Sequence, residues 1–141
     1  MNLDWKGCRE TNMAKRIEPD FRKARSIILA ANDREATANM LPLNETTKDT
    51  LVSLIYDVLR ELLEALALQK GYKIYNHECF TSFLLEVIKD EKLSRDFDSA
   101  RMLRNSINYY GKKIHLEDAK ASLGDLKEMI SKTRKLLENI G

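Results

Sequence analysis

A short polar segment in the last third of the sequence, RMLRNSINYYG at residues 101–111, holds the side chains best suited to chemistry. It gathers two arginines, two asparagines and two tyrosines and then reaches a glycine, a residue that commonly ends helices. Guanidinium, amide and phenol groups contact phosphates, bases and buried carboxylates. The segment is therefore the first candidate for a binding or catalytic site.

On a helix, the polar residues of this segment fall beside an apolar stripe. The polar residues share an arc of roughly 140° on that projection. They are Arg101, Arg104, Asn105, Asn108 and Tyr109. Residues 95–113 contain five basic and two acidic side chains, including Lys112 and Lys113 just past the glycine. The sequence predicts a local positive patch with a charge of +3 (five minus two) in a chain whose net charge is only +2.

The same residues also permit a purely structural interpretation. Arg104 borders the apolar stripe, and Glu61 interrupts an apolar flank of the most apolar predicted helix. Glu61 would then be the natural acid to pair with Arg104. Asn105 and Tyr109, one turn apart, would bond locally near the helix end. The residue chemistry leaves both interpretations open.

The elements that must position the segment are predicted to be helices. Charged residues make up 33% of the chain and apolar residues 43%, with only 5 Gly and 2 Pro, which is typical of a soluble, helix-rich domain. The predicted fold class is all-α, an antiparallel up-down bundle of about five helices. We expect one domain over residues 1–141, with residues 1–17 as a short helix or a docked N-terminal arm.

Periodicity and helix-ending residues give the expected helices. They cover residues 19–41, 47–70, 77–91, 93–110 and 116–140. The helix over 47–70 is the most apolar, with an apolar arc of roughly 220°. Such an arc fits a helix at the centre of a bundle, or one that also contacts a second subunit.

Cysteine and histidine usage offers little for metal chemistry. Cys8 and Cys79 form no C-x-x-C pair, and we expect them to be reduced thiols of a cytoplasmic protein. His77 and Cys79 form an H-x-C that could begin a zinc site with Cys8 or His115, but structural zinc sites normally show close-spaced pairs of ligands, so no metal is expected. Both histidines are expected to be capping or surface groups. No glycine-rich phosphate loop, cofactor motif, signal peptide or membrane-length apolar run is recognisable, and no membrane partner is expected.

The segment Arg104-Asn105-Ser106-Ile107-Asn108-Tyr109 resembles, in register, the motif of the HEPN superfamily. HEPN domains are small α-helical bundles whose penultimate long helix carries an Arg, a polar residue, three further positions and a His. Residues 60–80, RELLEALALQKGYKIYNHECF, are similar to the stretch between the second and third helices of that family. The similarity covers about residues 20–140, and Tyr109 stands at the His position.

The resemblance implies a homodimer whose motif helices line a shared cleft. Family members act either as metal-independent endoribonucleases or as non-catalytic partners of a minimal nucleotidyltransferase in toxin–antitoxin pairs. In the nuclease, the arginine stabilises the phosphorane charge and the histidine assists proton transfer from the ribose 2′-OH. The matching catalytic candidates are Arg104, Asn105 and Tyr109, and the candidate RNA contacts are Arg101, Asn108, Lys112 and Lys113.

Tyr109 decides how far this resemblance extends to activity. A phenol titrates near pH 10 in its reference state, so it is a poor general base at neutral pH. We therefore expect a protein that binds RNA or a nucleotidyltransferase partner, with weak or no ribonuclease activity. The alternatives are an active endoribonuclease that uses Arg104, Asn105 and Tyr109, and a helical scaffold that binds no nucleic acid.

Overall fold

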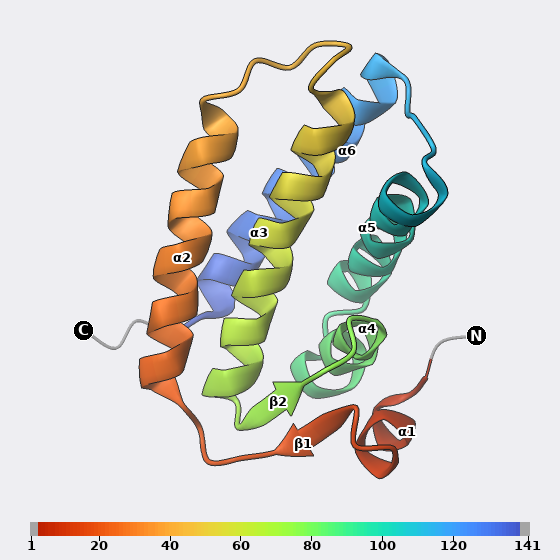
Figure 1. Ribbon diagram of the computed structural model, residues 1–141. Helices are drawn as coiled ribbons and strands as arrows, with labels where there is room; N and C mark the ends of the chain where they lie inside the picture. Colours follow the sequence, from red (N-terminus) through yellow and green to blue (C-terminus); the bar gives the residue numbers. More distant parts are fainter. Residues whose placement is uncertain (1–2, 139–141) are drawn as a thin grey trace.

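The fold is seen in a computed structural model that describes residues 3–138 (Figure 1). In chain order the elements are α1 (Trp5–Glu10), β1 (Ala14–Arg16), α2 (Phe21–Asn39), α3 (Lys48–Gln69), β2 (Tyr72–Ile74), α4 (Glu78–Phe83), the π-helical turn η1 (Leu84–Ile88), α5 (Glu91–Tyr110) and α6 (Leu116–Leu136). Four long helices dominate the described residues. The expected all-α helical bundle is confirmed.

Helix α3 is the centre of the bundle. It lies between α2 and α5, and α6 runs behind it (Figure 1). Its leucines Leu59, Leu62 and Leu66 are fully buried, and each is worth roughly 1.5–3 kcal/mol of hydrophobic stabilisation. The wide apolar arc of this helix is therefore covered by packing within one chain, and no second subunit is needed to explain it.

Local residues set where the long helices begin and end. The Asp20 carboxylate accepts a hydrogen bond from the Lys23 amide at 2.9 Å and so caps α2. Pro19 precedes this cap, so the helix begins slightly later than predicted. After α3 the chain turns at Gly71, where a φ of +88° and a close approach to the Ile17 carbonyl would strain any other residue.

The segment predicted as one helix over residues 77–91 is broken in two. Helix α4 passes into η1, and Lys89 then adopts a left-handed φ of 65° that ends the π-helical turn. Asp90 caps a new helix, so α5 begins at Glu91 instead of Leu93. Helix α6 ends at Leu136, and the last residue of its predicted range, Ile140, lies outside the described residues.

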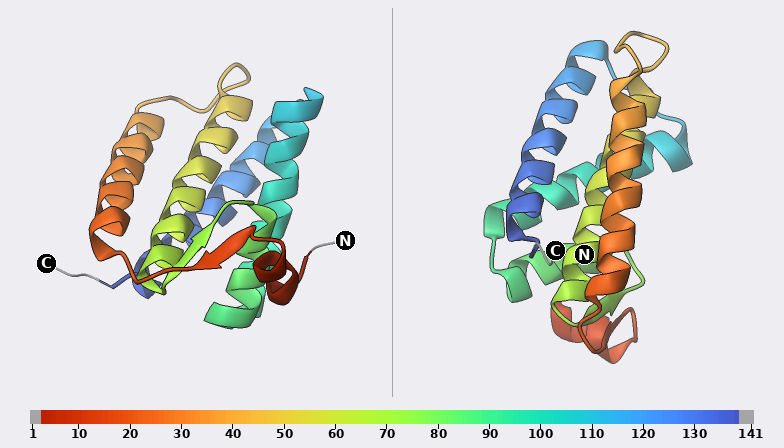
Figure 2. Two further views of the ribbon diagram at one scale, coloured as in Figure 1. Left: turned by 60° about the horizontal axis from the view of Figure 1, so that its bottom comes forward. Right: turned by 90° about the vertical axis from the view of Figure 1, so that its left-hand side faces the viewer.

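The N-terminal residues dock against the base of the bundle. Strand β1 pairs antiparallel with β2 in the register Ala14↔Ile74, Lys15↔Lys73 and Arg16↔Tyr72. Figure 2 shows this two-stranded ribbon and α1 crossing the end of the bundle where α3 finishes. The Trp5 ring of α1 packs 5.1 Å from the Tyr72 ring centre and 5.6 Å from that of Phe83. None of the described helices has the length and apolar content to cross a membrane.

Candidate functional site

Helix α5 carries the polar segment that the sequence singled out. It begins after Asp90, whose carboxylate accepts a hydrogen bond from the Leu93 amide at 3.0 Å, and it ends at Gly111 with a left-handed φ of 64°. Arg101 and Arg104 lie one turn apart, and their side chains are only 15% and 16% exposed. Because a largely buried guanidinium needs partners, the contacts of these arginines indicate their role.

Arg104 contacts one carboxylate and two aromatic rings. Its Nη2 donates a long hydrogen bond of 3.5 Å to Asp57 Oδ1 on α3. Its Cζ lies 5.5 Å from the ring centre of Tyr56 and 6.0 Å from that of Tyr109. Its Nε is buried and has no hydrogen-bond partner. Arg104 therefore keeps a donor that its acidic neighbour does not use.

The predicted pairing of Arg104 with Glu61 is wrong. The Glu61 carboxylate accepts a hydrogen bond from Arg34 Nε of α2. The reason is that α2 covers the flank of α3 on which Glu61 lies, so its arginine reaches this buried acid. Arg104 is left with a weaker acidic contact to Asp57.

Arg60 of α3 completes a group that we name the arginine cluster: Arg60, Arg101 and Arg104. Its Nε lies 3.9 Å from Asp57 Oδ1, and its Nη1 lies 3.6 Å from Glu64 Oε2. Both distances exceed those of a hydrogen bond. Asp57 Oδ1 thus lies between the guanidiniums of Arg60 and Arg104 without a short bond to either.

Carboxylates balance the charge of the cluster. Arg101 donates from Nε and Nη2 to Asp98 Oδ1 at 3.2 and 3.0 Å, and the same oxygen accepts from Thr81 Oγ1 at 3.0 Å. With Asp57 and Glu64, three carboxylates face three guanidiniums, so the formal charges of these six side chains sum to zero. The positive patch predicted from α5 alone is offset here by acids that α3 supplies.

Among the described residues, three buried side-chain nitrogen or oxygen atoms lack a hydrogen-bond partner, and all three belong to the arginine cluster or to the neighbouring Tyr56. They are Tyr56 Oη, Arg60 Nε and Arg104 Nε. Tyr56 is 1% exposed, and burial raises its pKa to about 12, against the opposing effect of the three arginines. The phenol therefore stays protonated at neutral pH, so each orphan atom has a proton to donate. Buried polar atoms normally find partners, so three unused donors on neighbouring side chains indicate a site for an acceptor.

His77 lies beside the arginine cluster, which the sequence did not predict. Its ring centre is 6.4 Å from that of Tyr56 and 6.2 Å from that of Phe80. Burial lowers its pKa to about 4, with a further lowering by the charges of Arg60, Arg104 and Arg101. Its side chain makes no capping hydrogen bond to α4 and is partly buried, so the expected capping or surface role is wrong.

The remaining predicted site residues lie at the exposed end of α5. Tyr109 is 70% exposed beside Arg104, and Asn105 is partly buried. Asn108 Oδ1 accepts a hydrogen bond from Ser53 Oγ at 2.9 Å, which ties α5 to α3. Lys112 and Lys113 follow the helix in an exposed connection. Tyr109 thus lies beside the arginine cluster, whereas both lysines lie beyond the end of the helix.

A separate hollow of about 300 Å³ lies between α5 and α6. Lys92, Asp96, Asp125 and Glu128 line it, together with apolar side chains, and none of the three arginines does. Lys92 donates to Asp96 at 2.6 Å. We place the candidate site at the arginine cluster, because the unused donors are there and the acids around the hollow have no such feature.

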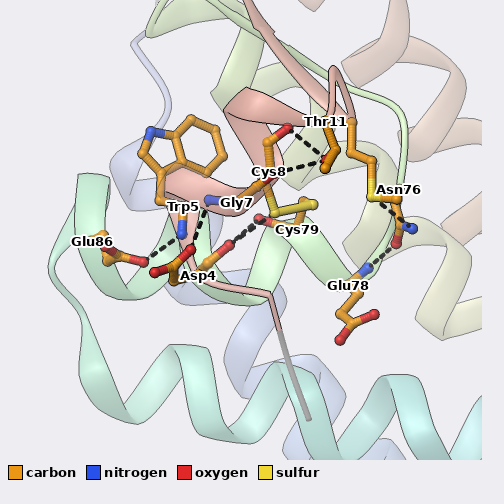
Figure 3. The surroundings of a disulfide bond; sticks show 11 residues. Asp4, Trp5, Gly7, Cys8, Thr11, Asn76, Glu78, Cys79 and Glu86 are labelled. Atoms are coloured by element: carbon orange, nitrogen blue, oxygen red, sulfur yellow. Dashed lines mark hydrogen bonds between the residues drawn. A yellow bond between two sulfur atoms is a disulfide. The ribbon is translucent and has the colours of Figure 1, made fainter.

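The two cysteines form a disulfide, so the expected reduced thiols are wrong. Cys8 of α1 and Cys79 of α4 are bonded across a sequence separation of 71, and both are fully buried (Figure 3). The sequence did not indicate this pairing, because it depends on the docking of α1 against α4. Within residues 3–138 there is no group of three or more His, Cys, Asp or Glu side chains placed to hold a metal ion.

No protein-family model matches this sequence, and no match was found among curated proteins or solved structures. The HEPN assignment therefore stays a prediction from the motif. A function for this chain has to be inferred from the contacts and charges of its own side chains.

Proposed function

We propose that the protein binds RNA through its phosphate backbone and that the arginine cluster is the phosphate contact. The observation that carries this proposal is that three buried donors without partners, Tyr56 Oη, Arg60 Nε and Arg104 Nε, belong to neighbouring side chains. A phosphate offers several acceptor oxygens, and arginine binds phosphate through paired N–H groups. The carboxylates between the arginines reduce their mutual repulsion and hold them in place before a ligand arrives.

Tyr109 supports single-stranded RNA as the form that binds. Its ring is 70% exposed and lies beside the Arg104 guanidinium. An exposed ring next to a phosphate contact is a stacking surface for an unpaired base, and such stacking recurs in recognition of single-stranded RNA. The resemblance of this segment to the HEPN motif leads to the same ligand.

Binding to a fluorescent single-stranded RNA, measured by anisotropy over a range of salt concentrations, tests the proposal. Arg104→Gln should weaken binding by roughly tenfold to a hundredfold, because a charge-assisted hydrogen bond is lost. It should also lower the salt slope by roughly 0.7, the value for one phosphate contact on a single strand. Arg95→Gln is the matched control, because Arg95 lies on the same helix, is 67% exposed and carries the same charge.

The proposal fails if Arg104→Gln and Arg95→Gln bind RNA alike. The arginine cluster would then be a charge-balanced structural network, as the scaffold hypothesis predicts. Thermal unfolding of both variants separates a lost contact from a lost fold. We expect Arg104→Gln to remain folded but to melt below the wild type, because the guanidinium is only 16% exposed and Asp57 loses one of its two cationic neighbours.

Metal-independent cleavage of RNA is the second candidate function, favoured by the position of His77. The neutral imidazole can accept a proton and the three guanidiniums can stabilise the phosphorane charge, although a pKa of about 4 makes His77 a weaker base than a free histidine. His77 would accept the 2′-OH proton, and the 2′-oxygen would attack the phosphorus. The bond from phosphorus to the 5′-oxygen would then break, and that oxygen would take a proton from water. The products would be a 2′,3′-cyclic phosphate and a 5′-hydroxyl.

His77→Gln and Tyr109→His test this second function in a buffer with a metal chelator. If the wild type cleaves through His77, His77→Gln should reduce the rate about a hundredfold to ten-thousandfold. Tyr109→His should raise the rate, because it adds a group that exchanges protons near neutrality at the position that matches the HEPN histidine. Arg104→Gln in the Tyr109→His background controls for a contaminating nuclease. Equal rates for the wild type and His77→Gln would exclude His77 as the base.

A homodimer and a nucleotidyltransferase partner stay predictions of the HEPN resemblance, and a cytoplasmic location stays a prediction from the cysteine usage and the N-terminal sequence. The apolar arc of α3 no longer supports the dimer, because α2, α5 and α6 cover it. Near the end of α5, Met102 and Tyr110 are 58% and 82% exposed. These two side chains remain available for contact with a second copy of the chain.

A further inference from the structure

The ribbon formed by β1 and β2 brings two lysines face to face. In the antiparallel register Lys15 is directly opposite Lys73, so both side chains project from the same face. Their Nζ atoms lie 5.8 and 5.4 Å from the ring centre of Tyr75, the residue after β2. The Tyr75 amide donates to the Met13 carbonyl at 2.7 Å and fixes the backbone of that residue. Both cations therefore lie near the Tyr75 ring.

Like charges that are directly opposite on paired strands destabilise a sheet. No described carboxylate lies within ion-pair distance of Lys15 or Lys73, so this repulsion is not compensated from within the described part of the chain. The Tyr75 ring attracts both cations through its π face. Tyr75 is 56% exposed, so much of the residue remains open to solvent. This pair of cations is therefore suited to an anionic group supplied by a ligand.

A second pair of cations lies around Tyr72, which with Arg16 projects from the opposite face of the ribbon, because successive side chains of a strand alternate in direction. Arg9 and Arg16 place their Cζ atoms 5.4 and 5.1 Å from the ring centre of Tyr72, and Arg16 Nη1 donates to Tyr72 Oη at 2.9 Å. Tyr72 packs on Trp5 and Phe83, which holds it in place. Both arginines are exposed, and no described acid pairs with either. The ribbon and the end of α1 thus present four cations, two near Tyr75 and two near Tyr72 on the opposite face, that lack the acidic partners of the arginine cluster.

The ribbon leads directly to the candidate site. Only Asn76 separates Tyr75 from His77, so their Cα atoms are at most about 7.6 Å apart. A strand of RNA that contacts the arginine cluster beside His77 can therefore continue over Tyr75 within about one nucleotide. The charge-balanced cluster offers little long-range attraction, whereas the unbalanced ribbon can supply it.

We propose that the β1–β2 ribbon is a second RNA contact, in which Lys15 and Lys73 bind a phosphate of a single strand and Tyr75 stacks on a neighbouring base. The proposal rests on the RNA-binding function above, because it concerns the same strand. A single-stranded nucleic acid fits better than an acidic protein segment, because the cations flank an exposed aromatic ring that can receive a base.

Oligouridylates of increasing length test the ribbon in the anisotropy assay. Lys15→Gln/Lys73→Gln should lower the salt slope by roughly 0.7, the value for the one phosphate that the two lysines share. Tyr75→Leu should weaken binding roughly fivefold to a hundredfold with little change in salt slope, because it removes stacking and leaves charge intact. Both losses should grow with RNA length, because only the longer strands reach the ribbon. Lys120→Gln/Lys127→Gln on α6 is the control for net charge, at the end of the bundle where α3 begins.

The outcomes separate this proposal from the one before it. Suppose that the wild type binds RNA and that Arg104→Gln binds it more weakly. If the lysine variant and Tyr75→Leu then bind as well as the α6 control, only the ribbon proposal fails. If the ribbon variants are weaker and Arg104→Gln is not, the ribbon stands and the arginine cluster fails. A wild type that binds no RNA overturns both. The ribbon proposal also fails if a poly-glutamate chain or inorganic polyphosphate competes as well as RNA of equal length, because neither carries bases.

Folding of the ribbon variants is expected to be intact. Removing two opposed like charges should leave the melting temperature equal to or above that of the wild type. A lower melting temperature would contradict the claim that the lysine pair is kept at a cost to stability. Tyr75→Leu keeps an apolar side chain at the exposed position, and circular dichroism checks its helical content.

Discussion

His77 is the residue whose protonation should control the acid stability of this protein. Its pKa is about 4 in the folded chain, compared with 6.5 for a free histidine. Between these values the unfolded chain binds a proton that the folded chain does not, so acid favours unfolding. The stabilisation is therefore complete above about pH 6.5 and is lost as the pH falls toward 4. Burial is the main cause, and the three arginines add to it.

Thermal unfolding between about pH 7 and about pH 4.5 checks this expectation. The wild type should melt at progressively lower temperature as the pH falls, and His77→Gln should show a smaller decrease. His115→Gln is the matched control, because His115 is exposed and this change removes one histidine at a position away from the cluster. An identical pH dependence in the wild type and His77→Gln would show that the folded protein does not hold this imidazole neutral.

The sequence identified only part of the candidate site, for a reason that these residues make clear. Arg101, Arg104 and Tyr109 share one helix, so a single helical projection groups them. Arg60 and His77 come from α3 and from the start of α4, and only the packing of those elements brings them to α5. A local signal for Arg60 did exist, because polar residues recur at helical spacing along the apolar α3. They are Asp57, Arg60, Glu61 and Glu64.

At the scale of elements, strongly periodic segments were predictable and interrupted ones were not. The residues of α3 and α6 repeat at helical spacing over five or more turns, so their type and most of their length follow from the sequence. The break between α4 and α5 depends on Lys89 in a left-handed conformation that lysine rarely adopts. The two strands are three residues each, which is too short for an alternating pattern to stand out.

The helices and the ribbon have different roles in the RNA binding that we propose. Helices α3 and α5 are held by a buried core and can fix the arginine cluster with precision. The ribbon is a small, exposed element whose side chains are unpaired with acids and open to a long ligand. Rigid helices would thus position one phosphate, and the ribbon would provide attraction and length.

For the molecule as a whole, the disulfide ties the N-terminal arm to the rest of the fold. Cys8 lies in α1, next to the ribbon, and Cys79 lies two residues after His77. The bond therefore holds together the two regions for which we propose RNA contacts. Disulfides are rare in the cytoplasm of most organisms, with hyperthermophiles as the main exception. Because both sulfur-bearing residues are 0% exposed, an attacking thiolate cannot reach the bond in the folded protein.

Reduction should lower the stability of the whole chain. Cross-linking residues separated by 71 positions restricts the unfolded state, and such a bond typically contributes about 2–4 kcal/mol. Denaturant unfolding with and without a reductant measures this difference, and fluorescence reports it because Trp5 beside Tyr72 is the only tryptophan of the sequence. Cys8→Ser/Cys79→Ser should unfold like the reduced wild type and should not respond to reductant. If the wild type, unfolded without reductant, shows two titratable thiols, the disulfide does not form. If its free energy of unfolding is the same with and without reductant, the disulfide does not stabilise the fold. If the bond forms and stabilises as expected, its loss should also weaken RNA binding more for long strands than for short ones, because the ribbon depends on the arm that Cys8 anchors.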